Sequence, residues 1–136
     1  MQRPWHGNGP LKTADFERGD MPWTPVGPSE IPVAEGWPLP HALTTSEIKN
    51  LIKDYVAAAQ RALAAGYKIA EIHGAHGYLV HSFLSPLSNK RNDDYGGNLE
   101  GRMRLALEIT QAVRAVWPEN LPLFFRTSAV DGVPEG

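Results

Sequence analysis

The chain has 136 residues, a formal net charge of −2, 42% hydrophobic residues and 21% charged residues, a composition typical of a globular protein rather than a disordered one. Near-neutral charge without a basic run gives no reason to expect nucleic acid or an anionic membrane as a partner. The absence of cysteine excludes disulfides, thiolate metal ligands and cysteine nucleophiles from this chain. Because no apolar run approaches the roughly 18 to 20 residues that span a bilayer, and MQRPWHGNGP has no apolar signal region, we expect a cytoplasmic protein.

The first 43 residues are rich in proline and tryptophan. Eight of the twelve prolines and three of the four tryptophans lie at or before Pro40. Since proline cannot donate a backbone hydrogen bond, we expect residues 1–43 to be irregular loop with at most short extended pieces. A loop of about 40 residues is long beside the usual 4 to 6 of a compact domain. This length indicates either a functional loop on a larger protein or a chain that has been cut just after a structural element that is missing here.

Regular patterns begin at Thr44 and predict a helix of about six turns. Thr44 and Glu47 have the spacing of a capping box, and Gly66 stands where a left-handed residue ends a helix. Between them, apolar residues recur at steps of three and four: Ile48, Leu51, Ile52, Tyr55, Val56, Ala59 and Leu63.

A strand, a loop, a second helix and a second strand are predicted next. YKIAEIH reads as a strand that ends at His73, with Ile69, Glu71 and His73 on one face. Residues 74–98, rich in Gly, Ser, Asn and Asp, are predicted as one long loop. A second helical repeat ends at Pro118; its members are Met103, Ala106, Ile109, Thr110, Val113, Val116 and Trp117. Residues 121–128, LPLFFRTS, then read as a strand.

This alternation predicts an α/β fold with a parallel sheet, either an open doubly wound sheet or a closed barrel. Ligands of both architectures sit at the carboxyl ends of the strands, the side on which the long loop after His73 lies. A barrel of eight strands needs about 250 residues. We therefore expect the chain to be part of a fold.

The stretch HGAHGYLVHSFLSP holds three of the five histidines within nine residues. His73 ends the predicted strand and His76 follows in a turn, so both rings could clamp one carbonyl or phenolate oxygen on which negative charge develops. A metal site is the second reading, with His81, Asp93 or Asp94 as a third ligand, although no HExxH helix is present. In the third reading one histidine packs and the other is solvated.

Two further side chains could act at the same strand ends. Tyr78 can donate its phenolic proton to a developing carbanion, or simply pack in the loop. Arg126 places a permanent cation there that could bind phosphate, carboxylate or a negatively charged cofactor ring. A salt bridge between Arg126 and Glu71 is the competing structural reading. In SNKRNDDYGGN, Arg91 with a nearby aspartate is expected to tie the loop together.

The run EIHGAHGYLVHSFLSPLSNKRNDDYGGNLEGRMRLALEI, followed by LPLFFRTSA, resembles the central segment of the Old Yellow Enzyme family of flavin-dependent ene-reductases. Within that family the likeness is greatest to NADPH dehydrogenases with a His/His substrate pair, and it covers roughly residues 38–131. The resemblance implies a (β/α)8 TIM barrel that binds FMN at its C-terminal face. It further implies that NADPH reduces the flavin and that the flavin N5 then delivers hydride to the β-carbon of an enone or related activated alkene.

The resemblance also implies roles for individual residues. His73 and His76 would bind the substrate's carbonyl oxygen, with Gly74 and Ala75 forming the turn between them. Tyr78 would protonate the α-carbon, and Arg126 would lie beside N1 and O2 of FMN, with no metal involved.

The chain departs from the family pattern at two positions, because Gly101 stands where the family usually has Asn and Asn98 where Ser is common. These changes bear on the packing of the loop rather than on the chemistry.

The resemblance places the chain from after the third barrel strand to the end of the fifth. Residues 1–136 would then form one incomplete FMN-binding barrel domain, with the Pro/Trp-rich segment 1–43 followed by helix-strand-loop-helix-strand in 44–136. We expect such a fragment to be inactive alone, and the full-length barrel could form a homo-oligomer. The alternatives are a barrel metallohydrolase with zinc on His73 and His76, and a non-catalytic remnant that binds a partner through its N-terminal segment.

Overall fold

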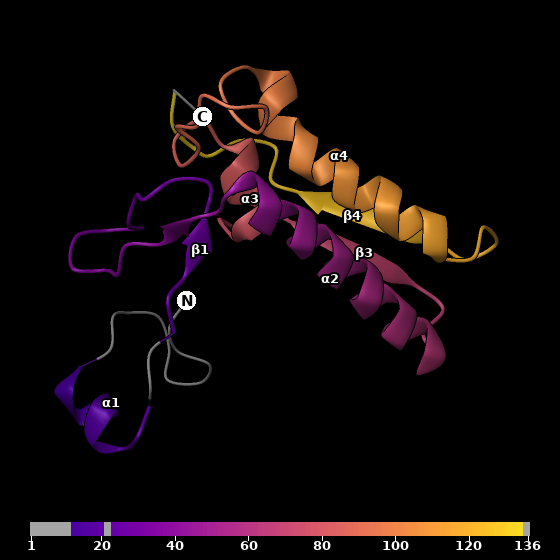
Figure 1. Ribbon diagram of the computed structural model, residues 1–136, viewed down its shortest axis with the longest axis horizontal. Helices are drawn as coiled ribbons and strands as arrows, with labels where there is room; N and C mark the ends of the chain where they lie inside the picture. Colours follow the sequence, from indigo (N-terminus) through magenta and orange to yellow (C-terminus); the bar gives the residue numbers. More distant parts are fainter. Residues whose placement is uncertain (1–11, 21–22, 135–136) are drawn as a thin grey trace.

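The computed structural model describes residues 12–20 and 23–134 (Figure 1). The predictions for residues 1–11 and 21–22 lie outside the described residues. The helices are α1 (Thr13–Glu17), α2 (Thr45–Ala64), α3 (Leu79–Leu84) and α4 (Leu99–Val116). The strands are β1 (Val26–Gly27), β2 (His41–Ala42), β3 (Ala70–Gly74) and β4 (Leu123–Thr127).

The centre of the molecule is a parallel pair of strands, β3 and β4, covered by two long helices. The register places His73 beside Arg126 and Ile72 beside Phe125. Figure 1 shows α2 and α4 lying along the strand pair and running parallel to each other. Side chains from α2, α3, α4 and β3 form one buried core, whose fully buried members are Ile48, Val80, Phe83, Leu105 and Ile109. The predicted parallel pairing is therefore confirmed.

One face of this strand pair points into the core and the other does not. Ile72 is buried among the helices, whereas Glu71 and Arg126 on the opposite face are exposed. Because side chains alternate along a strand and paired residues share a face, His73, Phe124 and Arg126 lie on the same open face. That face carries the predicted site.

The ends of α2 form as the sequence predicts. The Glu47 amide donates to Thr44 Oγ1 (3.3 Å), and the Thr44 amide donates to the Glu47 carboxylate (2.7 Å). The bond from the Thr44 amide, followed by bonds between the carboxylate and the side chains of His41 and Thr44, lowers the pKa of Glu47 to about 2. At the other end Gly66 adopts φ +91°, the left-handed conformation expected after a helix.

Two predicted loops contain short helices, so these predictions were wrong in part. Residues 74–98 include α3, whose Val80 and Phe83 are buried in the core. Six residues cover less than two turns, too few for a helical repeat to be visible in the sequence. The N-terminal segment contains the short α1 besides the two-residue strands β1 and β2, which form a parallel pair.

The loop before α4 fastens the N-terminal segment to the core. The Arg91 guanidinium donates to the carbonyls of Pro28 (3.0 Å) and Leu43 (2.6 Å), and it forms an ion pair with Asp93. The ion pair lowers the pKa of the Asp93 carboxyl. The prediction that Arg91 and an aspartate hold this loop together is confirmed, and the loop also holds residues 28–43 beside the site.

Among the described residues, no helix combines the length and the apolarity needed to cross a membrane.

Candidate functional site

The site begins where β3 ends. His73 is the fourth residue of β3 and is half-buried on the open face of the strand pair. Gly74, the last residue of β3, is buried; a Cβ there would lie 2.5 Å from the Phe125 ring, so this position admits no side chain without a shift. Ala75 is buried as well. The predicted roles of Gly74 and Ala75 in a substrate-binding turn remain predictions.

A tight turn follows and reverses the chain. The Tyr78 amide donates to the Ala75 carbonyl (3.2 Å), and the two residues between them have positive φ, +59° at His76 and +73° at Gly77. Left-handed backbone costs a residue with a Cβ roughly 1–2 kcal/mol, which makes His76 unusual. The His76 amide donates to Ser128 Oγ (3.1 Å), in the segment after β4.

This turn brings three predicted residues together. The ring centroids of His73 and His76 lie 5.1 Å apart, and those of His73 and Tyr78 lie 5.6 Å apart. Two imidazoles at this separation can each direct an N–H at one oxygen placed between them, at the usual distance of about 2.9 Å. Tyr78 is 46% exposed as a residue, and its ring borders the same space. The geometry therefore suits a double hydrogen bond to an oxygen with a proton donor beside it.

Arg126 stands next to His73 across the strand pair. Its side chain is exposed and, within the described part of the chain, has no ion-pair or hydrogen-bond partner. The competing prediction of a salt bridge with Glu71 is not met. An unpaired guanidinium on this face fits a negatively charged ring or a carboxylate, so the residues present are compatible with a reduced flavin.

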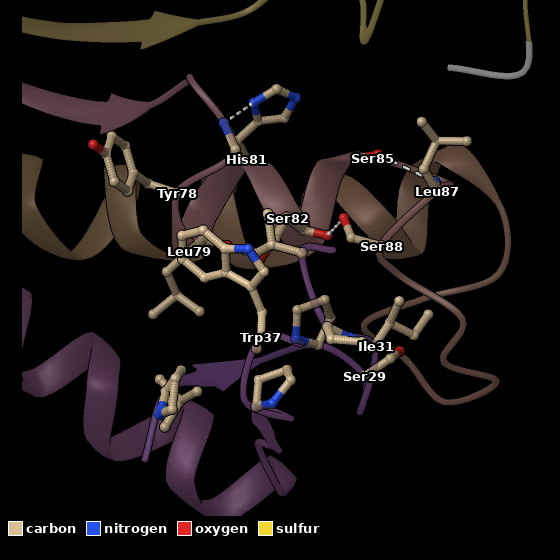
Figure 2. A pocket seen from close by; sticks show the side chains of 18 of the residues that line it. Ser29, Ile31, Trp37, Tyr78, Leu79, His81, Ser82, Ser85, Leu87 and Ser88 are labelled. Atoms are coloured by element: carbon tan, nitrogen blue, oxygen red, sulfur yellow. Dashed lines mark hydrogen bonds between the residues drawn. The ribbon is translucent and has the colours of Figure 1, made fainter. Parts of the chain in front are cut away.

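An open cleft of about 880 Å³ adjoins the turn on its other side (Figure 2). In Figure 2, Tyr78 and His81 border it from the α3 side, and Trp37 and Ile31 from the N-terminal segment border it opposite. Its lining includes His76 and Tyr78 but neither His73 nor Arg126, which lie on the strand face. The turn thus stands between the strand face and an apolar cleft.

His81 is not available as a metal ligand in this arrangement. Its Nδ1 accepts a hydrogen bond from the Gly77 amide (2.8 Å), and its Nε2 lies 2.8 Å from Asp131 Oδ1. In residues 12–20 and 23–134, no three His, Asp or Glu side chains are grouped so that they could hold a metal ion. Asp93, another suggested ligand, is paired with Arg91.

Sequence reasoning missed three residues that touch the turn or its support: Ser85, Ser128 and Asp131. Ser128 is the last residue of the predicted strand 121–128, but nothing in that pattern indicates its bond with the His76 amide. Asp131 lies 50 residues from His81, beyond any local spacing. Only the parallel pairing of β3 and β4 could have indicated that the segments after them meet.

The two departures from the family pattern lie at the start of α4. Asn98 caps α4, because its Oδ1 accepts from the Gly101 amide (2.9 Å). Gly101 is buried, and a Cβ there would lie 2.1 Å from the Gly96 carbonyl oxygen. The loop therefore approaches the helix closely where the family usually has Asn.

Comparisons with known proteins cover most of the chain. The chain is 51% identical over 107 residues to an NADPH dehydrogenase of Clostridium acetobutylicum. The matched region covers 79% of this chain and 32% of the relative. The chain is also 48% identical over 116 residues to an NADH:flavin oxidoreductase of Gibberella zeae, covering 85% of this chain and 28% of the relative. The chain thus spans about a third of the length of the curated relatives it matches.

Solved structures resemble the fold as well. Morphinone reductase in complex with tetrahydroNAD superposes with a TM-score of 0.72 at 36% identity, over 77% of this chain and 33% of that one. A 2-naphthoyl-CoA reductase complex gives a TM-score of 0.72 at 34% identity, over 76% of this chain and 16% of that one. The sequence pattern of the NADH:flavin oxidoreductase / NADH oxidase family matches residues 5–136. The chain belongs to this family, as the resemblance to Old Yellow Enzyme predicted.

Proposed function

We propose that the protein carrying this chain is an FMN-dependent, NADPH-dependent oxidoreductase that reduces the activated C=C bond of enones and related small alkenes. The observation that carries the proposal is the cluster of His73, His76 and Tyr78 at the carboxyl end of β3, beside the unpaired Arg126. Family membership and relatives named NADPH dehydrogenase support it. Morphinone reductase, a solved relative, binds a reduced nicotinamide analogue.

The roles of the residues follow from their chemistry. His73 and His76 donate hydrogen bonds to the substrate's carbonyl oxygen and so stabilise the negative charge that develops there. Tyr78 donates its phenolic proton to the α-carbon. Arg126 offsets negative charge on the cofactor ring. When bound, FMN supplies the hydride that adds to the β-carbon.

The proposal includes the architecture of the whole protein. We infer that residues 1–136 belong to one FMN-binding (β/α)8 barrel domain, as the segment from after the third strand to the end of the fifth. The similarity to morphinone reductase, at a TM-score of 0.72, supports this placement. A cytoplasmic location and a homo-oligomer of the full-length protein are parts of the same proposal.

The experiment uses the full-length purified protein. We expect a yellow sample whose flavin absorbance is bleached by NADPH under anaerobic conditions and restored by addition of 2-cyclohexenone, with cyclohexanone as the product. Cyclohexanone in place of the enone is the control and should not restore the absorbance. A colourless sample with stoichiometric zinc would contradict the proposal and favour a metallohydrolase, for which the described residues offer no ligand set.

A further inference from the structure

A largely buried chain of hydrogen bonds holds the turn after β3. The Gly77 amide donates to His81 Nδ1 (2.8 Å), and His81 Nε2 meets Asp131 Oδ1 (2.8 Å). The Ser85 hydroxyl donates to Asp131 Oδ2 (2.5 Å). The side chains of His81 and Asp131 are exposed to only 11% and 12%. None of these three side chains has a role in the proposed chemistry.

The directions of these bonds are fixed by their donors. A backbone amide can only donate, so Nδ1 of His81 must be without a proton. The proton of the neutral ring is then on Nε2, where it is donated to Asp131. Asp131, held in place by Ser85, thereby selects the tautomer of His81 that can accept from Gly77.

The backbone amide that donates to His81 belongs to Gly77, which lies between two residues of the proposed chemistry. Gly77 separates His76 from Tyr78, and both His76 and Gly77 have left-handed backbone. A second bond joins the turn to the segment after β4, from the His76 amide to Ser128 Oγ. Asp131 is in that segment too, so the turn after β3 is held twice by the chain that follows β4.

We propose that His81 and Asp131 are positioning residues that fix the places of His76 and Tyr78 relative to His73, and that Ser85 assists by its hydrogen bond to Asp131. The inference rests on the proposed function, since it concerns the same site. Loss of the acceptor at Nδ1 releases the Gly77 amide, and the turn then relaxes from its left-handed conformation. The three rings lose their mutual geometry while the helices and strands remain.

The test compares four variants of the full-length, FMN-loaded protein. His81→Leu removes both ring nitrogens, whereas His81→Asn keeps a carbonyl acceptor near the position of Nδ1. Asp131→Leu removes the group that selects the tautomer, whereas Asp131→Asn keeps an oxygen that can accept from Nε2. The matched control is His41→Leu, because His41 also contacts a carboxylate, Glu47 (3.0 Å), but on the surface at α2.

The first readout is the two half-reactions measured separately. We expect His81→Leu and Asp131→Leu to slow alkene reduction about 10- to 100-fold with little change in flavin reduction by NADPH. His81→Asn and Asp131→Asn should recover most of that loss, and His41→Leu should behave as wild type. Wild-type alkene reduction in both leucine variants, or equal loss in each Asn/Leu pair, would overturn the proposal.

The second readout does not depend on activity. Hydrogen exchange of the Gly77 amide should accelerate in His81→Leu and stay slow in His81→Asn; equal exchange in the two variants overturns the inference. This separates the two hypotheses. A wild-type protein that reduces no alkene contradicts the proposed function. If Gly77 exchange becomes fast only in the leucine variants, the role of His81 in holding the Gly77 amide is still supported.

Discussion

His76 is the residue on which the geometry of the site depends most. The three-residue spacing from His73 predicts that the two rings can meet, and their centroids lie 5.1 Å apart. The left-handed φ of +59° could not be predicted, because it is set by bonds to Ser128 and, through Gly77, to His81. Those partners are distant in the sequence or lie in a helix that the sequence pattern did not reveal.

Joint replacement of His73 and His76 by Ala tests the oxygen clamp. A phenolate oxygen can take the place of the developing oxyanion between the two rings, so we expect a phenol bound against oxidised FMN to give a charge-transfer band. Because both donors to the oxygen are removed, we expect the band to disappear in titrations of the FMN-loaded protein with 4-hydroxybenzaldehyde. The control His41→Leu should retain it. A band of unaltered intensity and midpoint in the double variant would remove the clamp assignment.

Among the helices, the long periodic ones could be predicted from the sequence and the short ones could not. The helices α2 and α4 are predicted by apolar residues repeated over several turns. The N-cap Thr44 of α2, and Pro118 shortly after the end of α4, are also visible in the sequence. The helix α3 has six residues, and its bounds depend on Val80 and Phe83 entering a core made by other elements. Tertiary packing, rather than local helix propensity, therefore determines that this segment is helical.

The loop before α4 depends on one buried amide side chain, Asn89. Its Nδ2 donates to the carbonyls of Phe83 (2.7 Å) and Tyr95 (2.8 Å). Asn89→Ala leaves these buried acceptors without that donor, so we expect a loss of about 2 to 4 kcal/mol in the free energy of unfolding. The exposed Asn92 offers the control, and Asn92→Ala should change stability by less than about 0.5 kcal/mol. Denaturant melts of both variants of the full-length protein decide; equal stability would contradict the role of Asn89.

The cap of α2 predicts a pH dependence. The pKa of Glu47 is lowered to about 2 by bonds from Thr44 and His41, so the folded state binds this proton less readily than the unfolded chain. Its stabilisation is present above about pH 4.5 and is lost as the pH falls toward 2. Glu47→Gln should therefore reduce the fall in melting temperature across this window. Glu119→Gln is the control, and identical curves for wild type and Glu47→Gln would refute the expectation.

The two strands of the central sheet, β3 and β4, pair with each other and with no further strand in the described part of the chain. Phe124 is 53% exposed and Phe125 37% exposed, on opposite faces of β4. The parallel pairing of β3 with β4 could be predicted from the alternation of helices and strands. What covers these faces could not be predicted, because the match with the relative from Clostridium acetobutylicum covers only 32% of that protein's length.

We expect the isolated 136-residue chain to fold poorly and to retain no FMN. Exposed strand edges and uncovered aromatic side chains favour association over a unique fold. Thermal unfolding followed by circular dichroism should show no cooperative transition, and gel filtration with added FMN should separate protein from flavin. The full-length protein is the control. A cooperative melt together with co-eluting flavin from the isolated chain would contradict this expectation.

Tyr78, in the turn after β3, is the proposed proton donor of alkene reduction. The most direct measurement is stopped-flow absorbance of Tyr78→Phe in the full-length, FMN-loaded protein, with the two half-reactions observed separately. We expect reoxidation of the flavin by 2-cyclohexenone to slow by about 100-fold or more, since general acid catalysis typically contributes that much, while reduction by NADPH is nearly unchanged. An equal loss in both half-reactions, or no loss in either, would contradict the assignment of Tyr78 as the proton donor.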